Sequence, residues 1–583
     1  MMLRVLIVLT AFAIANGCGS DPSGSGADGG ADLGDGGAGT DRDATSSGCV
    51  PQTCADRNWS CGQFISCGLA VDCADEGSEC RSGETCIGGI NGPTECVAQG
   101  GATCDVCDAI PDCSDEAQPT VLRGRVITPG RDDADVGNQV GVPNAVVAIL
   151  ATSDPETLPP IPAGLPPGET SCSRCEDQAE FLGPFLTGAL TDATGHFELE
   201  ADIPVGTEIV LVTMAGKFRR AEVIELSEEA ACTTTDLPVE LGGEASNPTR
   251  LPRSMDDEGF GIHIPRIVVT TGRVDAMECV LEKIGLDHGE FGNPGSDARV
   301  HLYLGQLGEG LRIDGDTPPD TDLYSDLSAL ESYDIYISDC QGNNFDDDFE
   351  LRDAHGDNII DYVNRGGRMF ASHLSFTWLH GNGELAFDPE NPLATGLADA
   401  AEFNESLIAS PDSGTGVISF DSPNADPTRI TQFALWMDNE GVTSGEPYEF
   451  PILEPRPQAL ELGPHTQEYV HCNSSDCDDS AQQFAFDTPY GAPADDACGR
   501  VAFSAFHVAS GGSYIDGTFP DDCLGGDLTD QEKVLLFMLF DLAACVGDPL
   551  PPECTPRECD QRECGLLVDG CGGIIDCGVC PIE

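Results

Sequence analysis

The same cysteine spacing occurs near both ends of this 583-residue sequence, and it constrains the fold more than any other feature. One copy begins with a C-x4-C pair at Cys49 and the other at Cys554, and each continues with Cys-Gly and closes with a C-x5-C pair. Both copies contain few large apolar side chains, so disulfides must hold them in place of a hydrophobic core. We therefore predict small disulfide-rich modules over residues 49–113 and 550–583, on either side of regions with cores of their own.

The first residues, MMLRVLIVLTAFAIANGCGS, predict export. Arg4 precedes an apolar run from Val5 to Ala15, which is shorter than the roughly 20 residues needed to span a bilayer. The small residues before Cys18 resemble a bacterial lipobox, which implies a signal peptide over residues 1–17 and lipid attachment at Cys18. Ordinary cleavage near Ala15, which would give a secreted protein, is the alternative.

Residues 18–48 are rich in Gly, Asp and Ser and contain almost nothing that could form a core. Such a composition predicts a disordered acidic tether with a reach of roughly 30 Å. We expect the protein to be exported to the outer membrane or the cell surface, with a lipid anchor as its contact with the membrane.

Export also determines how the 28 cysteines are interpreted, because an oxidising compartment favours disulfides over thiolate metal sites. Zinc binding by CDVC (104–107) and CGVC (577–580) is the alternative, but a second CxxC at ribbon spacing is missing. The terminal repeats resemble the Cys-rich repeats of secreted proteins from predatory and gliding bacteria, a myxobacterial type. If Cys18 carries lipid, an odd number of cysteines remains for pairing.

The charge limits the choice of partners. The sequence has 101 acidic and 27 basic residues, a net charge of −74 that repels nucleic acid and anionic lipid surfaces. We expect a solvated acidic surface, and Ca²⁺ binding is a further possibility for which no EF-hand loop is present. The expected partner is an unidentified surface or extracellular ligand, and no cofactor is predicted.

Residues 120–245 have the pattern of a β-sandwich. Short runs of alternating apolar residues are separated by Gly, Pro and Asp, as in TVLRGRVITPG and GVPNAVVAIL. With TDATGHFEL, their order resembles the carboxypeptidase regulatory-like (transthyretin-like) domain, which implies a non-catalytic accessory role. An insertion carries Cys172 and Cys175, and we expect them to form a loop-stapling disulfide, because no βαβ setting is visible that would favour a redox role.

Residues 250–547 change to alternating strands and helices, which predicts an α/β doubly wound parallel sheet. The last helix, LTDQEKVLLFMLFDLAAC, begins with a capping box of Thr529 and Glu532. The predicted strands are RIVVTT (266–271), RVHLYL (299–304), YDIYIS (333–338), RMFAS (368–372) and RVAFSAFH (500–507).

Three of these strands end in polar clusters. They end at Ser338–Asp339–Cys340, at Ser372–His373 and at His507. Ligands of such sheets bind beyond the carboxyl ends of the strands, so we expect the clusters to converge on one edge, with Asp339 and His373 in a ligand cleft.

The segments SALESYDIYISDCQG, YVNRGGRMFASH and AFSAFHVA resemble the class I glutamine amidotransferase-like superfamily, including its trehalose-utilisation branch. The resemblance places His507 on the catalytic histidine, but Ala509 replaces the glutamate that normally follows it. No Gly-x-Cys-x-Gly elbow is present, and Phe370 and Leu374 are too large for an elbow centred on Ser372. The resemblance therefore implies a degenerate member whose ancestral chemistry is lost.

Three alternatives remain open at this edge. Ser372 and His507 could form a hydrolytic pair, or Cys340 could be a displaced nucleophile, although the other cysteines of the region make a disulfide the expected state of Cys340. A metal site of His373, His507 and Asp339 is the third. We expect an exported surface lipoprotein that acts by binding or display, and the alternative is a hydrolase of a carbohydrate or amide substrate.

Overall fold

The computed structural model describes residues 104–543, apart from short gaps, and six strands outside that range. The chain divides into two compact units, residues 1–49 and 50–583, and the first contains no described residue. The predicted signal peptide and tether, Cys18, Cys175 and Ala509 therefore lie outside the described residues. None of the described helices is long and apolar enough to cross a membrane. The gaps are 114–117, 131–138, 173–180, 201, 239–246, 306–307, 309, 341–344, 384–385, 405–412, 421, 423–425, 444–447, 473–476, 478 and 508–515.

Both cysteine repeats contain an antiparallel hairpin at the same place. In the first copy β1 (Gln63–Ser66) pairs with β2 (Leu69–Asp72), and in the second β27 (Leu566–Val568) pairs with β28 (Ile574–Asp576). In each copy the first strand begins directly after the Cys-Gly pair. A second hairpin, of β3 (Glu84–Gly88) and β4 (Thr94–Ala98), follows the first copy.

Two sheets form the region predicted as a sandwich. A five-stranded sheet has the order β12-β10-β9-β6-β7, and a three-stranded sheet has the order β11-β5-β8. Side chains from both sheets, such as Leu122 and Val147, belong to one buried cluster. The strands are β5 (Val121–Arg125), β6 (Val146–Leu150), β7 (Phe185–Leu190), β8 (His196–Glu200), β9 (Thr207–Ala215), β10 (Phe218–Leu226), β11 (Thr234–Asp236) and β12 (Phe260–His263).

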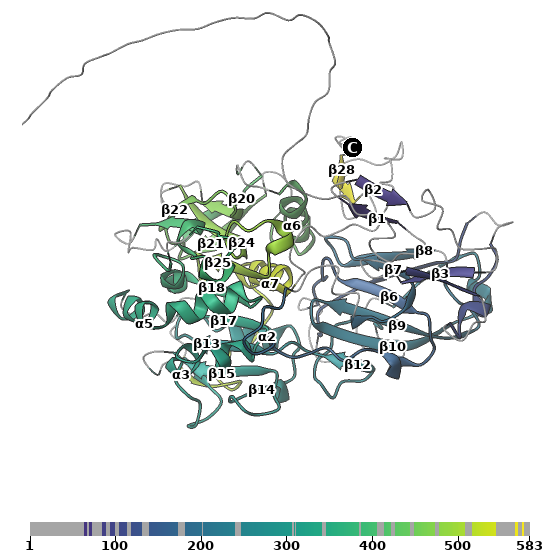
Figure 1. The fold of residues 1–583 in the computed structure, drawn as a ribbon, viewed down its shortest axis with the longest axis horizontal. Helices are drawn as coiled ribbons and strands as arrows, with labels where there is room; N and C mark the ends of the chain where they lie inside the picture. The colour runs from purple at the N-terminus through teal and green to yellow at the C-terminus, as the bar shows by residue number, and fades with distance from the viewer. Residues whose placement is uncertain are drawn as a thin grey trace, which may run out of the picture. The chain divides into compact units, whose positions relative to one another are not determined.

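A ten-stranded sheet organises the rest of the chain, in the order β14-β15-β13-β17-β18-β25-β24-β23-β20-β21 (Figure 1). The first six strands are parallel, and all five strands predicted from the sequence lie in this half. They are β13 (Ile267–Thr271), β14 (Phe291–Gly292), β15 (Val300–Leu304), β17 (Ile335–Ser338), β18 (Arg368–Ser372) and β25 (Gly499–Ser504).

The prediction of an entirely parallel sheet was wrong for the other half, where four strands run antiparallel. Residues 480–504 form a hairpin of two long strands, and such a short connection can only reverse the chain direction. The four strands are β20 (Ser413–Ile418), β21 (Glu449–Leu453), β23 (Gln467–Cys472) and β24 (Ser480–Thr488).

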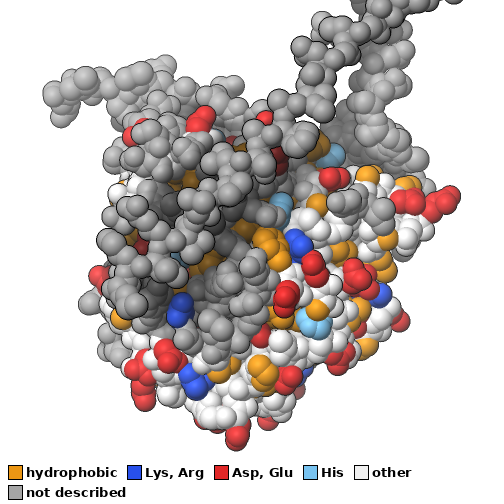
Figure 2. All heavy atoms as spheres, turned by 90° about the vertical axis from the view of Figure 1, so that its left-hand side faces the viewer, with side chains coloured by type: hydrophobic (Ala, Val, Ile, Leu, Met, Phe, Trp, Pro, Cys, Tyr) orange, Lys and Arg blue, Asp and Glu red, His pale blue; other side chains and the backbone are white. Residues whose placement is uncertain are grey.

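Helices cover both faces of this sheet. Alternate residues of one strand enter different cores: Ile335 and Ile337 of β17 pack with α2, α6 and α7, and Tyr336 packs with α3, α4 and α5. Acidic side chains are spread over the face drawn in Figure 2, where Lys and Arg are fewer. The helices are α2 (Met277–Lys283), α3 (Thr321–Tyr324), α4 (Leu327–Glu331), α5 (Phe345–Asn364), α6 (Pro427–Asn439) and α7 (Asp530–Ala543).

The predicted capping box of α7 is confirmed. The backbone N–H of Thr529 donates to the Glu532 carboxylate at 2.8 Å, and the N–H of Glu532 donates to the Thr529 hydroxyl at 3.2 Å. Each residue therefore satisfies a backbone donor that the first turn of the helix would leave unpaired.

The disulfides correct two expectations. Cys172 pairs with Cys498 instead of Cys175, because the backbone N–H of Ser171 donates to the Arg365 carbonyl and holds this loop against the end of α5. Cys340 is not in a disulfide. The described cysteines that could have paired with it are taken by one another or by Cys172. The described disulfides are Cys104–Cys107, Cys113–Cys232, Cys172–Cys498, Cys279–Cys523 and Cys472–Cys477.

Candidate functional site

The polar residues at the carboxyl ends of three parallel strands lie together, as predicted. Cys340 comes two residues after β17, His373 directly after β18 and His507 three residues after β25. One potential ligand atom of each residue lies within 4.8 Å of the others. The three side chains are the only group of this kind among the described residues, and we call them the Cys-His-His cluster.

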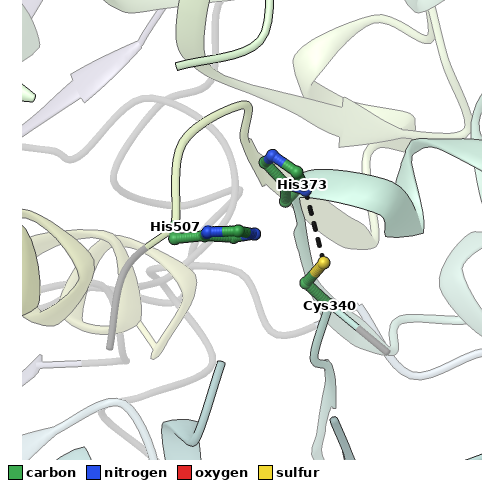
Figure 3. A group of neighbouring side chains, drawn as sticks. All are labelled: Cys340, His373 and His507. Atoms are coloured by element: carbon green, nitrogen blue, oxygen red, sulfur yellow. Dashed lines mark hydrogen bonds between the residues drawn. The ribbon is translucent and has the colours of Figure 1, made fainter. Parts of the chain in front are cut away.

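Within the Cys-His-His cluster the contacts are close (Figure 3). Cys340 Sγ lies 3.3 Å from Nδ1 of His373, within hydrogen-bond distance, and the two imidazole centroids are 3.9 Å apart. Cys340, His373 and His507 are 0%, 4% and 6% exposed. The thiol and both rings are therefore almost completely withdrawn from solvent.

The backbone turns sharply at His373, one residue after Ser372, the position at which the sequence argued against an elbow. His373 has φ 48°, the strained conformation of a residue at a sharp turn from strand to helix, whereas Ser372 is still extended in β18. The residues two positions before and after His373 are Ala371 and Ser375, which are small, as an elbow requires. The turn thus presents an imidazole at the position where a nucleophile elbow presents its nucleophile.

Ser372 does not form the predicted pair with His507. Its hydroxyl donates a short hydrogen bond to the Asp275 carboxylate, and the side chain is fully buried. Asp275 was not identified from the sequence, although it lies in the turn between β13 and α2, just beyond the carboxyl end of a predicted strand.

Glu454 is a second residue that sequence reasoning missed. Its carboxylate makes a short contact with Nδ1 of His507, and its φ of 51° is also in the left-handed region. A strained φ of this kind costs of order 1–3 kcal/mol, so surrounding structure must hold both His373 and Glu454 in place. Glu454 follows β21 directly, in the antiparallel half of the sheet that the sequence did not predict.

The electrostatic surroundings of the two imidazoles differ. Burial lowers the pKa of His373 well below 6.5, and the neighbouring His507 and Arg456 lower it further. Burial also lowers the pKa of His507, but Asp275, the Cys340 sulfur and Glu454 outweigh it and raise the pKa to about 9. Without a bound cation, His373 is therefore neutral and His507 is protonated at neutral pH.

Asp339 does not belong to the Cys-His-His cluster, contrary to the prediction of a ligand-cleft residue. It is fully buried, and its Oδ2 accepts from the backbone N–H of Met277 in the first turn of α2, at 3.4 Å. Burial raises its pKa well above 3.8, and the charges of Glu278 and Asp275 raise it further. Burial likewise raises the pKa of Glu278 to about 7. Three buried acids thus lie close to one another at this edge.

The arrangement offers one thiol and two imidazoles to a ligand. These groups suit a transition metal, and the free thiol beside a histidine also has the ingredients of a nucleophile. No protein-family model matches the sequence, and a comparison with curated proteins finds no match.

Proposed function

We propose that the protein is an exported, lipid-anchored surface protein that acts by binding, and that its α/β region has lost hydrolytic chemistry. The observation that carries the proposal is the elbow, which presents His373 in place of a nucleophile. The hydroxyl of the neighbouring Ser372 is bonded to Asp275 and not to a histidine. A general base must lie within hydrogen-bond reach of the proton it removes, and Ser372 has a carboxylate there instead of an imidazole.

The arrangement of the strands supports the resemblance on which this proposal rests. The parallel strands follow the order β15-β13-β17-β18-β25, in which the chain starts at β13, adds one strand on one side and continues on the other. This order resembles flavodoxin-like doubly wound sheets, whose ligands bind at the carboxyl edge beside the point of reversal. The two-sheet region fits a transthyretin-like accessory domain in the same protein, and the cysteine repeats and tether fit display at a surface.

Covalent probes test the loss of hydrolytic chemistry. The folded full chain is incubated with a fluorophosphonate, which labels activated serines, and Ser372 is then examined by peptide mass spectrometry. We expect no label on Ser372. Labelling of the folded wild type that disappears in Ser372→Ala would contradict the proposal.

The anchor has a separate test. Cys18→Ala should release the protein from the membrane fraction, because a single cysteine carries the acyl chains. Ala15→Val, which alters the region before the cleavage site without removing the acceptor, is the comparison variant. Retention of Cys18→Ala in membranes would contradict lipid attachment.

A hydrolase that uses Cys340 is the second candidate, and the free thiol beside the His507–Glu454 pair is the observation that favours it. Such an enzyme would react through the Cys340 thiolate, with protonated His507 stabilising the thiolate and donating a proton to the leaving group. Iodoacetamide should then modify Cys340 in the folded protein and abolish ester hydrolysis, and His507→Ala should abolish hydrolysis too. The binding proposal predicts a buried thiol that is alkylated only after unfolding.

A further inference from the structure

We propose that Cys340, His373 and His507 form a binding site for a zinc-like divalent transition-metal ion. A thiolate and two imidazoles are the donors that zinc takes in proteins, and the thiolate excludes hard cations such as Mg²⁺ and Ca²⁺. This inference deepens the proposed binding function by naming what the α/β region binds.

The distances suit a tetrahedral ion. With Zn–S of ~2.3 Å and Zn–N of ~2.0 Å, tetrahedral geometry places sulfur and nitrogen ligands about 3.5 Å apart. Cys340 Sγ and His373 Nδ1 are 3.3 Å apart, and all three ligand atoms lie within 4.8 Å of one another. The ligand atoms that are furthest apart would have to move closer by roughly one ångström, which side-chain rotation can supply.

His507 provides an independent indication of a ligand. Its Nε2 is buried, and none of the described residues makes a hydrogen bond of normal geometry with it. Buried polar atoms are almost always hydrogen-bonded, so an exception requires an explanation. Because Nδ1 is occupied by Glu454, Nε2 is the atom that His507 presents to the Cys-His-His cluster.

Glu454 has the role of a supporting residue in this site. Histidines that bind metal usually direct the other ring nitrogen to a carboxylate or carbonyl, which fixes the orientation of the ring. The contact between Glu454 and Nδ1 of His507 is of this kind. Both His373 and Glu454 have positive φ, so the backbone is strained at one ligand and at the residue that supports another.

The nearby acids also favour a cation. The fully buried Glu278 and Asp339 interact with each other, and neither forms an ion pair with a described basic side chain. Buried carboxyl groups are costly without compensation, and a divalent ion bound at Cys340, the residue after Asp339, would supply a positive charge. An ordinary buried hydrogen-bonded cluster would leave Nε2 of His507 without a partner of normal geometry among the described residues.

Metal titration of the full chain tests the site. Zn(II) binding is measured by competition with a chromophoric chelator, and Co(II) is used as a spectroscopic probe, because a Co(II)-thiolate bond gives a charge-transfer band. We expect one high-affinity ion per chain in the wild type and none at this site in Cys340→Ser. His373→Ala and His507→Ala should lower the affinity by more than the roughly 100-fold that a supporting residue can contribute, and Glu454→Gln by about 10- to 100-fold.

His288→Ala is the matched control, because that imidazole is half exposed and lies outside the Cys-His-His cluster. The affinity of this variant for Zn(II) should equal that of the wild type. Circular dichroism establishes that each variant folds, and Cys340→Ala is used if the serine variant does not. A Co(II) spectrum without a thiolate band, or equal Zn(II) binding by wild type and Cys340→Ser, would overturn the inference. Neither result affects the fluorophosphonate test, so failure of the metal site and failure of the proposed function can be distinguished.

Discussion

The buried charges at the two ends of the neighbouring parallel strands β18 and β25 are compensated in different ways. At their amino ends Arg368 and Arg500 lie side by side, and Arg500 pairs with Asp487 at 2.6 Å and Asp541 at 3.2 Å. At their carboxyl ends lie the Cys-His-His cluster and the buried acids, where Glu278 and Asp339 interact with each other but form no ion pair with a described basic side chain.

The difference separates structural charges from functional ones. Arg500 is 1% exposed, and its charge is matched by two carboxylates, although Nη2 of Arg500 and Oδ2 of Asp541 have no hydrogen-bond partner among the described residues. At the carboxyl end, by contrast, the buried acids Glu278 and Asp339 form no ion pair with a described basic side chain, and Nε2 of His507 has no partner of normal geometry. Proteins retain such costly groups mainly at functional sites. The amino ends should therefore respond to mutation through stability, and the carboxyl ends through ligand binding.

The largest effect is expected at the amino end. Arg500→Met should reduce the free energy of unfolding by about 3–5 kcal/mol, because it removes a buried guanidinium and leaves the partly buried Asp487 and Asp541 with less compensation. Urea unfolding measures the loss. The exposed Arg312, which pairs with an exposed aspartate, provides the control, and Arg312→Met should cost less than about 1 kcal/mol. If the two changes had equal effects, the ion pairs of Arg500 would contribute no more to stability than a surface ion pair.

The Cys172–Cys498 disulfide lies beside Arg500 and should also be purely structural. The double variant Cys172→Ser/Cys498→Ser should lose about 2–4 kcal/mol of unfolding free energy. Alkylation of the unfolded, unreduced wild type is the companion measurement, and it should modify Cys340 but neither Cys172 nor Cys498. Finding Cys340 in a disulfide would contradict the free thiol that the structure shows at the carboxyl ends of the parallel strands.

Glu278→Gln should have the opposite sign and stabilise the protein when no metal is bound. The pKa of Glu278 is raised to about 7, above the value of about 4.3 for an unfolded chain. Its contribution to stability is therefore present at low pH and is lost as the pH rises through 7. We expect a gain of roughly 1–3 kcal/mol near pH 8 and a smaller gain near pH 5. A destabilised variant at both pH values would show that the carboxylate is compensated.

The smallest effect concerns α7, which connects the two ends. Its first turn lies near the cluster, where Gln531 donates to the His507 carbonyl, and Asp541 in its last turn pairs with Arg500. Thr529→Ala should cost about 1 kcal/mol by removing the cap, and Thr529→Ser should restore most of it. If Thr529→Ser lost as much stability as Thr529→Ala, the hydroxyl cap would contribute nothing.

The sequence predicted what depends on local patterns. The five parallel strands and the α7 capping box follow from periodicity and from residues three positions apart, and the strand ends at Cys340, His373 and His507 followed from the parallel arrangement. The sequence argued against an elbow at Ser372 because Phe370 and Leu374 are large. It did not reveal the turn at His373, because that turn depends on φ, which sequence does not display. Glu454 was missed because its contact with His507 spans 53 residues of sequence and depends on antiparallel strands.

The location of a bound ion tests the central claim most directly. Crystals of the full chain grown with Zn(II) can be measured on both sides of the zinc absorption edge, so that an anomalous difference map locates the metal. We predict one strong peak at bonding distance from Cys340 Sγ, a ring nitrogen of His373 and Nε2 of His507, at ~2.3 Å from sulfur and ~2.0 Å from nitrogen. A map with no peak at the cluster, or with peaks only at surface acids, would contradict the claim that the carboxyl ends of these strands form a metal site.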